Sequence, residues 1–290
     1  MPALLALIAV TAVWGLTFVQ VKDAVELYPL FAFLALRFAI ASATLAWPAA
    51  ARARRLGRDG WIGGVALGLL LAAGYALQTA GLERTTVSST GFITGLYVVF
   101  TPLLAFALFG TRIGAATMAG VALSTFGLAL LSGVEAGSWT GDALVLAGSA
   151  AYSLQIVLME RYAPRHDPLG FTFVEMLAAF AGFGVVAVAA GQLEVPHGWT
   201  VWGALLVTGV FASALAFLVQ TWAQRRTSAT RTALAFAMEP VFAAAFGFWL
   251  AGDRFGAAGW AGAVLIMAGI VAAEPAAAAT LRRLLPLRAA

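Results

Sequence analysis

The sequence predicts an all-α integral membrane protein whose ten transmembrane helices form two inverted five-helix repeats. Three observations lead to this fold class. The first is composition: 62% of the 290 residues are apolar and only 10% are charged, with a mean hydropathy of +0.93. A soluble domain carries about 25% charged residues. The second observation is a series of ten long apolar stretches, and the third is an internal duplication of the chain.

Each apolar stretch is long enough to cross a membrane. A hydrocarbon core about 30 Å thick needs roughly 20 residues of helix. Alternating strand patterns are absent from the sequence, so helices rather than a barrel are expected to satisfy the backbone within lipid. The expected spans are residues 3–21, 29–50, 62–81, 87–109, 115–134, 144–162, 169–190, 201–220, 232–251 and 257–273.

The segment 78–127 recurs 142 positions later, at 220–269, with 18 of its 50 positions identical and no gap. A repeat of five helices crosses the membrane an odd number of times, so the second copy enters from the opposite face. Inverted repeats of this kind are the architecture of many secondary transporters, with the substrate site between the halves. We expect a first repeat at 1–136, a second, inverted repeat at 137–274 and a basic cytoplasmic tail at 275–290. The alternative is a repeat kept only for packing.

Lysine and arginine residues set the expected orientation. With the N-terminus in the cytoplasm, thirteen arginines fall in cytoplasmic segments, and only Lys22, Arg84 and Arg254 fall outside. We therefore expect a multi-pass protein of the bacterial cytoplasmic (inner) membrane with both termini cytoplasmic. The net charge of +4 then reflects membrane orientation rather than nucleic-acid binding.

Polar and aromatic side chains share helical faces at corresponding positions of the two repeats. Tyr75 and Gln78 are three residues apart, and their repeat mates are Phe217 and Gln220. Such faces are expected to converge and line a substrate-binding cavity. The expected lining residues are Trp14, Thr17, Tyr75, Gln78, Thr94, Tyr97, Tyr152, Gln155, Phe217, Gln220, Phe236 and Glu239. The alternative for each is structural, since Thr and Gln often bond between membrane helices, and Trp and Tyr often lie at membrane interfaces.

Three ionisable residues, Arg37, Glu175 and Glu239, fall deep inside the expected spans, where a charge costs about 3 kcal/mol or more and normally faces protein or water. We expect Arg37 to be structural, paired with a carbonyl or a loop carboxylate, and Glu175 to be a structural charge as well. Glu239 is either structural or the residue that couples transport to a proton, exchanging it for the substrate's positive end. The next residue, Pro240, leaves the carbonyl four residues earlier without a donor, which predicts a bend.

Several function classes lack the residues that they need. The chain has no cysteine and only two histidines, both in expected loops, so we expect neither a disulfide nor a metal site. It contains no Gly-x-x-x-x-Gly-Lys-Ser/Thr motif, so we expect no ATP motor in this chain and infer no ATPase subunit. No catalytic constellation is visible, so we expect neither an enzyme nor a cofactor. A membrane enzyme and an accessory subunit are the alternatives to a transporter.

Weak motifs occur in a specific order along nearly the whole chain. They are Trp14-Gly15, Phe18-Val19 and Lys22 in the first span, Arg37, Pro240, the Gly-Asp-Arg turn at 252–254, and the glycine pairs Gly120/Gly127 and Gly262/Gly269. In these residues the chain resembles the drug/metabolite transporter (DMT) superfamily, specifically its ten-helix EamA-type members. Within that superfamily it looks most like the YddG-type amino-acid exporters. The acidic residue usual before the arginine is Asp253 in the second half but Thr111 in the first.

The resemblance implies two inverted bundles around a substrate cavity, and a secondary transporter that works by alternating access. The implied activity is export of amino acids, aromatic or other apolar, and related small metabolites, with the lipid bilayer as the other partner. A zwitterion needs donors for its carboxylate and acceptors for its ammonium, which the glutamines, Tyr97, Trp14 and Glu239 can supply. The same aromatic and acidic set suits a lipophilic cation through cation–π contact, so a multidrug exporter is the alternative.

Overall fold

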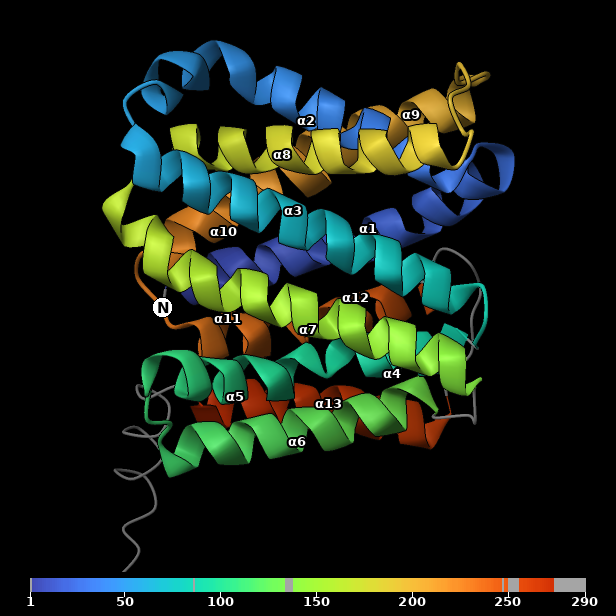
Figure 1. Cartoon of the computed structure of the whole chain (residues 1–290). Helices are drawn as coiled ribbons and strands as arrows, with labels where there is room; N and C mark the ends of the chain where they lie inside the picture. The colour runs from blue at the N-terminus through green and yellow to red at the C-terminus, as the bar shows by residue number, and fades with distance from the viewer. Residues whose placement is uncertain (1, 86, 134–137, 247, 250–255, 274–290) are drawn as a thin grey trace, which may run out of the picture.

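Helices form all the regular structure of the described residues, which are 2–85, 87–133, 138–246, 248–249 and 256–273 of a computed structural model (Figure 1). The elements are α1 (Pro2–Leu27), α2 (Leu30–Ala53), α3 (Gly57–Leu82), α4 (Val87–Gly95), α5 (Tyr97–Phe109), α6 (Ala115–Ser132), α7 (Trp139–Tyr162), η1 (Ala163–Arg165), α8 (Pro168–Ala189), α9 (Trp199–Gly209), η2 (Val210–Leu215), α10 (Ala216–Gln224), α11 (Ala229–Phe236), α12 (Glu239–Phe246) and α13 (Ala257–Ala273). The expected tail, the turn at 252–254 and the side chains of Phe18, Val19 and Lys22 lie outside the described residues.

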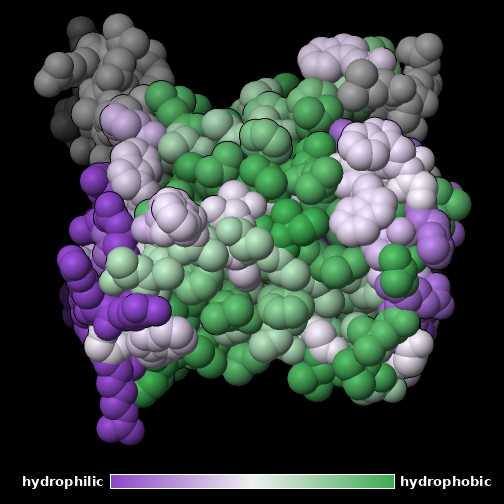
Figure 2. Space-filling model, turned by 90° about the horizontal axis from the view of Figure 1, so that it is seen from above, coloured by the Kyte–Doolittle hydropathy of each residue, from purple (hydrophilic) through white to green (hydrophobic). Residues whose placement is uncertain are grey.

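The surface and the helix lengths are those of a multi-pass membrane protein. Among the described residues, seven helical stretches are long and apolar enough to cross a membrane: Leu30–Ala53, Gly57–Leu82, Ser89–Phe109, Ala115–Ser132, Trp139–Arg165, Pro168–Ala189 and Trp199–Gln224. Pro2–Thr17 and Ala257–Ala273 are shorter apolar helices. Figure 2 shows a broad hydrophobic surface between polar margins. Because Phe106, Phe126 and Val185 are mostly exposed on the molecule, its outer surface suits contact with lipid.

The long helices lie side by side in antiparallel pairs, α2 with α8, α3 with α7 and α6 with α13 (Figure 1). The α2–α3, α5–α6 and α7–α8 connections lie at the end of the molecule that carries the N-terminus (Figure 1). The α1–α2, α3–α4 and α8–α9 connections lie at the opposite end (Figure 1). The arginine-rich connection after α2 is therefore on the same side as the N-terminus.

The expected fourth and ninth spans are not continuous helices. The fourth is divided at Leu96 into α4 and α5, and the ninth is divided at residues 237–238 into α11 and α12. At each point a backbone N–H, of Leu96 or of Met238, donates to the carbonyl three residues earlier, as in a tight 3₁₀ turn. Pro240 favours the second interruption, because a helix usually ends at or before the residue preceding a proline. The interruptions at Leu96 and Met238 are separated by 142 positions, the offset of the duplication.

The expected eighth span contains a π-helical turn, η2, between α9 and α10. Such turns are rare and frequently occur at functional sites. Here the carbonyl of Ala212, inside the turn, accepts hydrogen bonds from the side chains of Trp14 in α1 and Arg37 in α2. The irregular turn therefore connects three elements.

Helices α6 and α13 meet backbone to backbone at two glycine pairs. A Cβ atom on Gly127 would lie 2.6 Å from the carbonyl oxygen of Gly262. A Cβ on Gly120 would similarly collide with the carbonyl oxygen of Gly269. Small residues allow membrane helices to approach this closely, so these four glycines explain why α6 and α13 pack along one another.

Gly127→Ala is expected to destabilise the protein by about 1–3 kcal/mol, because the added methyl group forces the two backbones apart. Gly184→Ala in α8 is the matched control, since a Cβ there meets nothing within 4 Å. It should be neutral or stabilising, because alanine restricts the unfolded chain more than glycine does. Thermal unfolding of the purified variants in detergent measures both effects, and equal midpoints would contradict the close approach.

Candidate functional site

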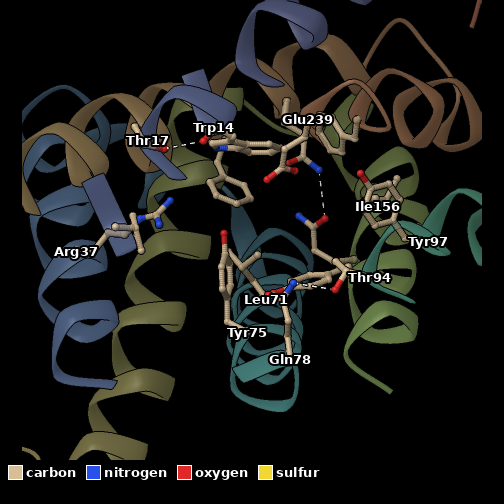
Figure 3. A pocket seen from close by; sticks show the side chains of 16 residues that line it. Trp14, Thr17, Arg37, Leu71, Tyr75, Gln78, Thr94, Tyr97, Ile156 and Glu239 are labelled. Atoms are coloured by element: carbon tan, nitrogen blue, oxygen red, sulfur yellow. Dashed lines mark hydrogen bonds between the residues drawn. The ribbon is translucent and has the colours of Figure 1, made fainter. Parts of the chain in front are cut away.

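The described residues that line a cavity of about 180 Å³ come from nine helices, α1 to α5, α7 and α10 to α12. Figure 3 shows this cavity from close by. Its wall consists of Trp14, Thr17, Val21, Arg37, Leu71, Tyr75, Gln78, Thr94, Tyr97, Tyr152, Gln155, Ile156, Phe217, Gln220, Phe236 and Glu239. The structure thus brings together all twelve residues selected by the duplicated faces, although substrate binding by them stays a prediction. The wall also contains four residues not expected there, of which Arg37 is the only charged one.

Both helix interruptions lie on the cavity wall. Thr94 and Tyr97 flank the division at Leu96, and Phe236 and Glu239 flank the division at 237–238. In many transporters, discontinuous helices form the substrate site, because unwound backbone is tolerated where it lines a cavity. The position of the interruptions therefore fits a binding site.

Aromatic rings form the apolar part of the wall. The Trp14 ring centroid lies 5.0 Å from that of Phe236 and 5.8 Å from that of Phe217. Tyr75 and Tyr152 meet edge to face, with centroids 5.4 Å apart. These separations are in the favourable range for aromatic pairs. The Trp14 indole N–H is fixed by its 2.8 Å bond to the Ala212 carbonyl, so the ring presents a defined surface to the cavity.

Gln78 connects three helices on the polar side of the wall. Its Oε1 accepts a hydrogen bond from the Tyr152 hydroxyl at 3.0 Å, and its Nε2 donates to Thr94 Oγ1 at 2.9 Å. Because both the oxygen and the nitrogen of the side-chain amide form hydrogen bonds, the side chain has one defined orientation.

A second polar network begins at the cavity and ends in the buried region behind it. Gln220 Nε2 donates to Gln155 Oε1 at 3.2 Å and to Gln224 Oε1 at 2.9 Å. Gln155 Nε2 donates to Glu175 Oε1 at 2.7 Å. Glu175 is fully buried and is not on the cavity wall. Within the described residues, Glu175 Oε2 and Gln220 Oε1 have no hydrogen-bond partner.

Arg37 is buried and bonded to neutral groups. Its Nε donates to Ser213 Oγ at 2.7 Å, and one terminal nitrogen donates to the Ala212 carbonyl at 3.2 Å. The pairing with a carbonyl fits the structural role expected for it. The position of Arg37 on the cavity wall was not expected from the sequence. Its charge could have indicated this position, because a charge at this depth faces protein or water.

Glu239 lies on another part of the same wall (Figure 3). Its carboxylate forms neither a hydrogen bond nor an ion pair with any described residue, and no ion pair within 4.0 Å joins it to Arg37. The cavity therefore holds one positive and one negative side chain that do not contact each other.

Glu175→Gln should unfold at the same temperature as the parent or higher. The amide keeps an oxygen for Gln155 and carries no charge that burial could penalise. Glu175→Ala should lose about 1–3 kcal/mol, because it leaves the Gln155 amide without its acceptor in a buried site. Thermal unfolding in detergent distinguishes the two. A glutamine variant as unstable as the alanine variant would show that the buried site requires the carboxylate itself.

Comparisons with known proteins place the fold and the family. The model of the EamA-like transporter family matches the chain twice, at residues 1–133 and 139–273. An uncharacterized transporter of Archaeoglobus fulgidus is 30% identical over 275 residues, covering 92% of this chain and 84% of its own. The uncharacterized transporter YyaM of Bacillus subtilis is 25% identical over 72% of each chain. A crystal structure at 21% identity superposes with a TM-score of 0.81 over 96% of this chain and 98% of its own.

Proposed function

The chain belongs to the EamA-like transporter family, and on that premise we propose that it is a secondary exporter of apolar or aromatic amino acids and related small metabolites. The observation that carries this proposal is the wall of the cavity. It combines aromatic rings with glutamine, tyrosine and charged side chains, so an apolar side chain and a polar backbone-like group both find partners. A volume of about 180 Å³ suits a small metabolite, since drug-sized ligands occupy pockets of roughly 300–1,000 Å³.

The proposed architecture is ten spans in two inverted repeats, at 1–136 and 137–274. Two observations support it: the paired helix interruptions at the duplication offset and the cavity wall drawn from both proposed halves. Inverted halves can exchange conformations, and the cavity then opens to each side in turn.

A lipophilic-cation exporter is the second candidate. The rings of Trp14, Phe217 and Phe236 lie on the same wall as Glu239, and such a set attracts an organic cation. Arg37 on that wall acts against this candidate, because a like charge raises the cost of binding a cation.

We propose that the N-terminal end of the bundle faces the cytoplasm. Single cysteines test this directly because the chain has none. Arg58→Cys lies at the N-terminal end, and Val195→Cys, whose parent residue is 70% exposed, lies at the opposite end. A membrane-impermeant maleimide added outside cells should label Val195→Cys, and should label Arg58→Cys only after permeabilisation. The reverse pattern would invert the proposed orientation.

Proteoliposome counterflow with a panel of labelled amino acids tests the function, and leucine and phenylalanine should exchange. Tyr152→Phe should reduce exchange about tenfold, because it leaves Gln78 Oε1 in the cavity wall without its donor. Tyr162→Phe, in the same helix but not on the wall, is the matched control and should exchange normally. Absence of counterflow for every amino acid would overturn the proposed substrate class.

Coupling to protons is proposed through Glu239, which would exchange a proton for the substrate's ammonium group. The titratable or charged groups that share its cavity wall are Arg37, Tyr75, Tyr97 and Tyr152. In Glu239→Gln, downhill exchange should continue at reduced affinity, because the amide oxygen still accepts a hydrogen bond, but stimulation by a pH gradient should disappear. The exposed Glu83→Gln is the control. Retained stimulation in a folded Glu239→Gln variant would assign coupling elsewhere.

A further inference from the structure

The cavity is lined by one basic and one acidic side chain that do not contact each other. A charged side chain at membrane depth is normally paired, but Arg37 and Glu239 form no ion pair within the 4.0 Å limit anywhere among the described residues. Both side chains line the same cavity, one from α2 and the other from α12 (Figure 3). The basic and the acidic side chain therefore lie at separate places on the cavity wall.

Hydrogen bonds orient the guanidinium of Arg37 but occupy only some of its N–H groups. Ser213 Oγ and the Ala212 carbonyl each accept one of its N–H groups. A guanidinium has five N–H donors, so it retains donors for a ligand. Both partners are neutral, and no described carboxylate lies within ion-pair distance of the guanidinium. An anchored guanidinium with free N–H groups is a suitable receptor for a carboxylate.

Glu239 offers the complementary end. Its carboxylate has no hydrogen-bond donor among the described residues, and the rings of Trp14 and Phe236, which pack against each other, line the same cavity. An ammonium group supplies three donors and a positive charge.

We infer that Arg37 and Glu239 select a zwitterion, with Arg37 holding the carboxylate of the substrate and Glu239 holding its ammonium group. This inference rests on the proposed function and assigns Arg37 a role in specificity in addition to its structural bonds. An amine without a carboxylate leaves Arg37 without the anion that would pair with it, and an acid without an amine leaves Glu239 without the ammonium group that would release its proton. Leaving one buried charge without its partner carries a large penalty, so both analogues should bind much more weakly than the amino acid.

The wild-type protein provides the first test. Labelled leucine counterflow in proteoliposomes is challenged with unlabelled leucine, with isopentylamine, which is leucine without its carboxylate, and with 4-methylpentanoate, which is leucine without its amine. Each analogue should compete at least about tenfold less well than leucine. Isopentylamine that competes as well as leucine would overturn the inference and leave the transport proposal standing. Absence of counterflow with leucine and with every other labelled amino acid would overturn both.

Variants then assign the two ends. In Arg37→Gln, isopentylamine should compete with labelled leucine almost as well as unlabelled leucine does. In Glu239→Gln, the same should hold for 4-methylpentanoate. Ser213→Ala is the control for the structural bond, since it removes one partner of Arg37 and keeps the charge, and it should retain the wild-type ranking. If folded variants at both positions keep that ranking, the assignment is wrong. If Arg37→Gln does not fold, the wild-type ranking and Glu239→Gln decide.

Discussion

Backbone groups released inside hydrocarbon need partners within the protein, and this constraint explains where the structure is irregular. The helices are interrupted at Leu96, at 237–238 and in the π turn η2. The first two lie on the cavity wall, and the third supplies the Ala212 carbonyl to Trp14 and Arg37. The interrupted helices therefore lie at or next to the cavity, because backbone N–H and C=O groups without a helical partner are tolerated only where side chains or a ligand can reach them.

Polar side chains follow the same constraint. Gln78, Gln155 and Gln220 each bond to side chains of neighbouring helices, and these bonds fix the shape of the wall before a ligand arrives. A preorganised wall lowers the entropy that binding must cost. Glycine contacts between α6 and α13 lie outside this wall, so close helix packing and the cavity wall depend on different residues.

Much of the wall could be predicted from the sequence because the duplication repeats its chemistry. Tyr75 and Gln78 were found with Phe217 and Gln220 as pairs, which a single helix would not have revealed. The role of Arg37 was predicted only in part. Its partners Ser213 and Ala212 lie about 175 residues away, in a π turn that no sequence signal marks. The division at Leu96 was not expected either, because no proline follows it directly and Gly95, directly before it, is of a type common inside membrane helices. The division before Pro240 had such a signal.

The separation of Arg37 and Glu239 also affects the energetics of the cavity. At an effective dielectric constant of 20, two unit charges 4 Å apart attract by about 4 kcal/mol, and Arg37 and Glu239 are farther apart than the 4.0 Å limit for an ion pair. Desolvation costs several kcal/mol for each ion, so their mutual attraction does not offset it. A ligand that carries both charges contacts each side chain directly and replaces one weak distant interaction with two close ones. A zwitterion bound as proposed would supply a partner for both side chains at once.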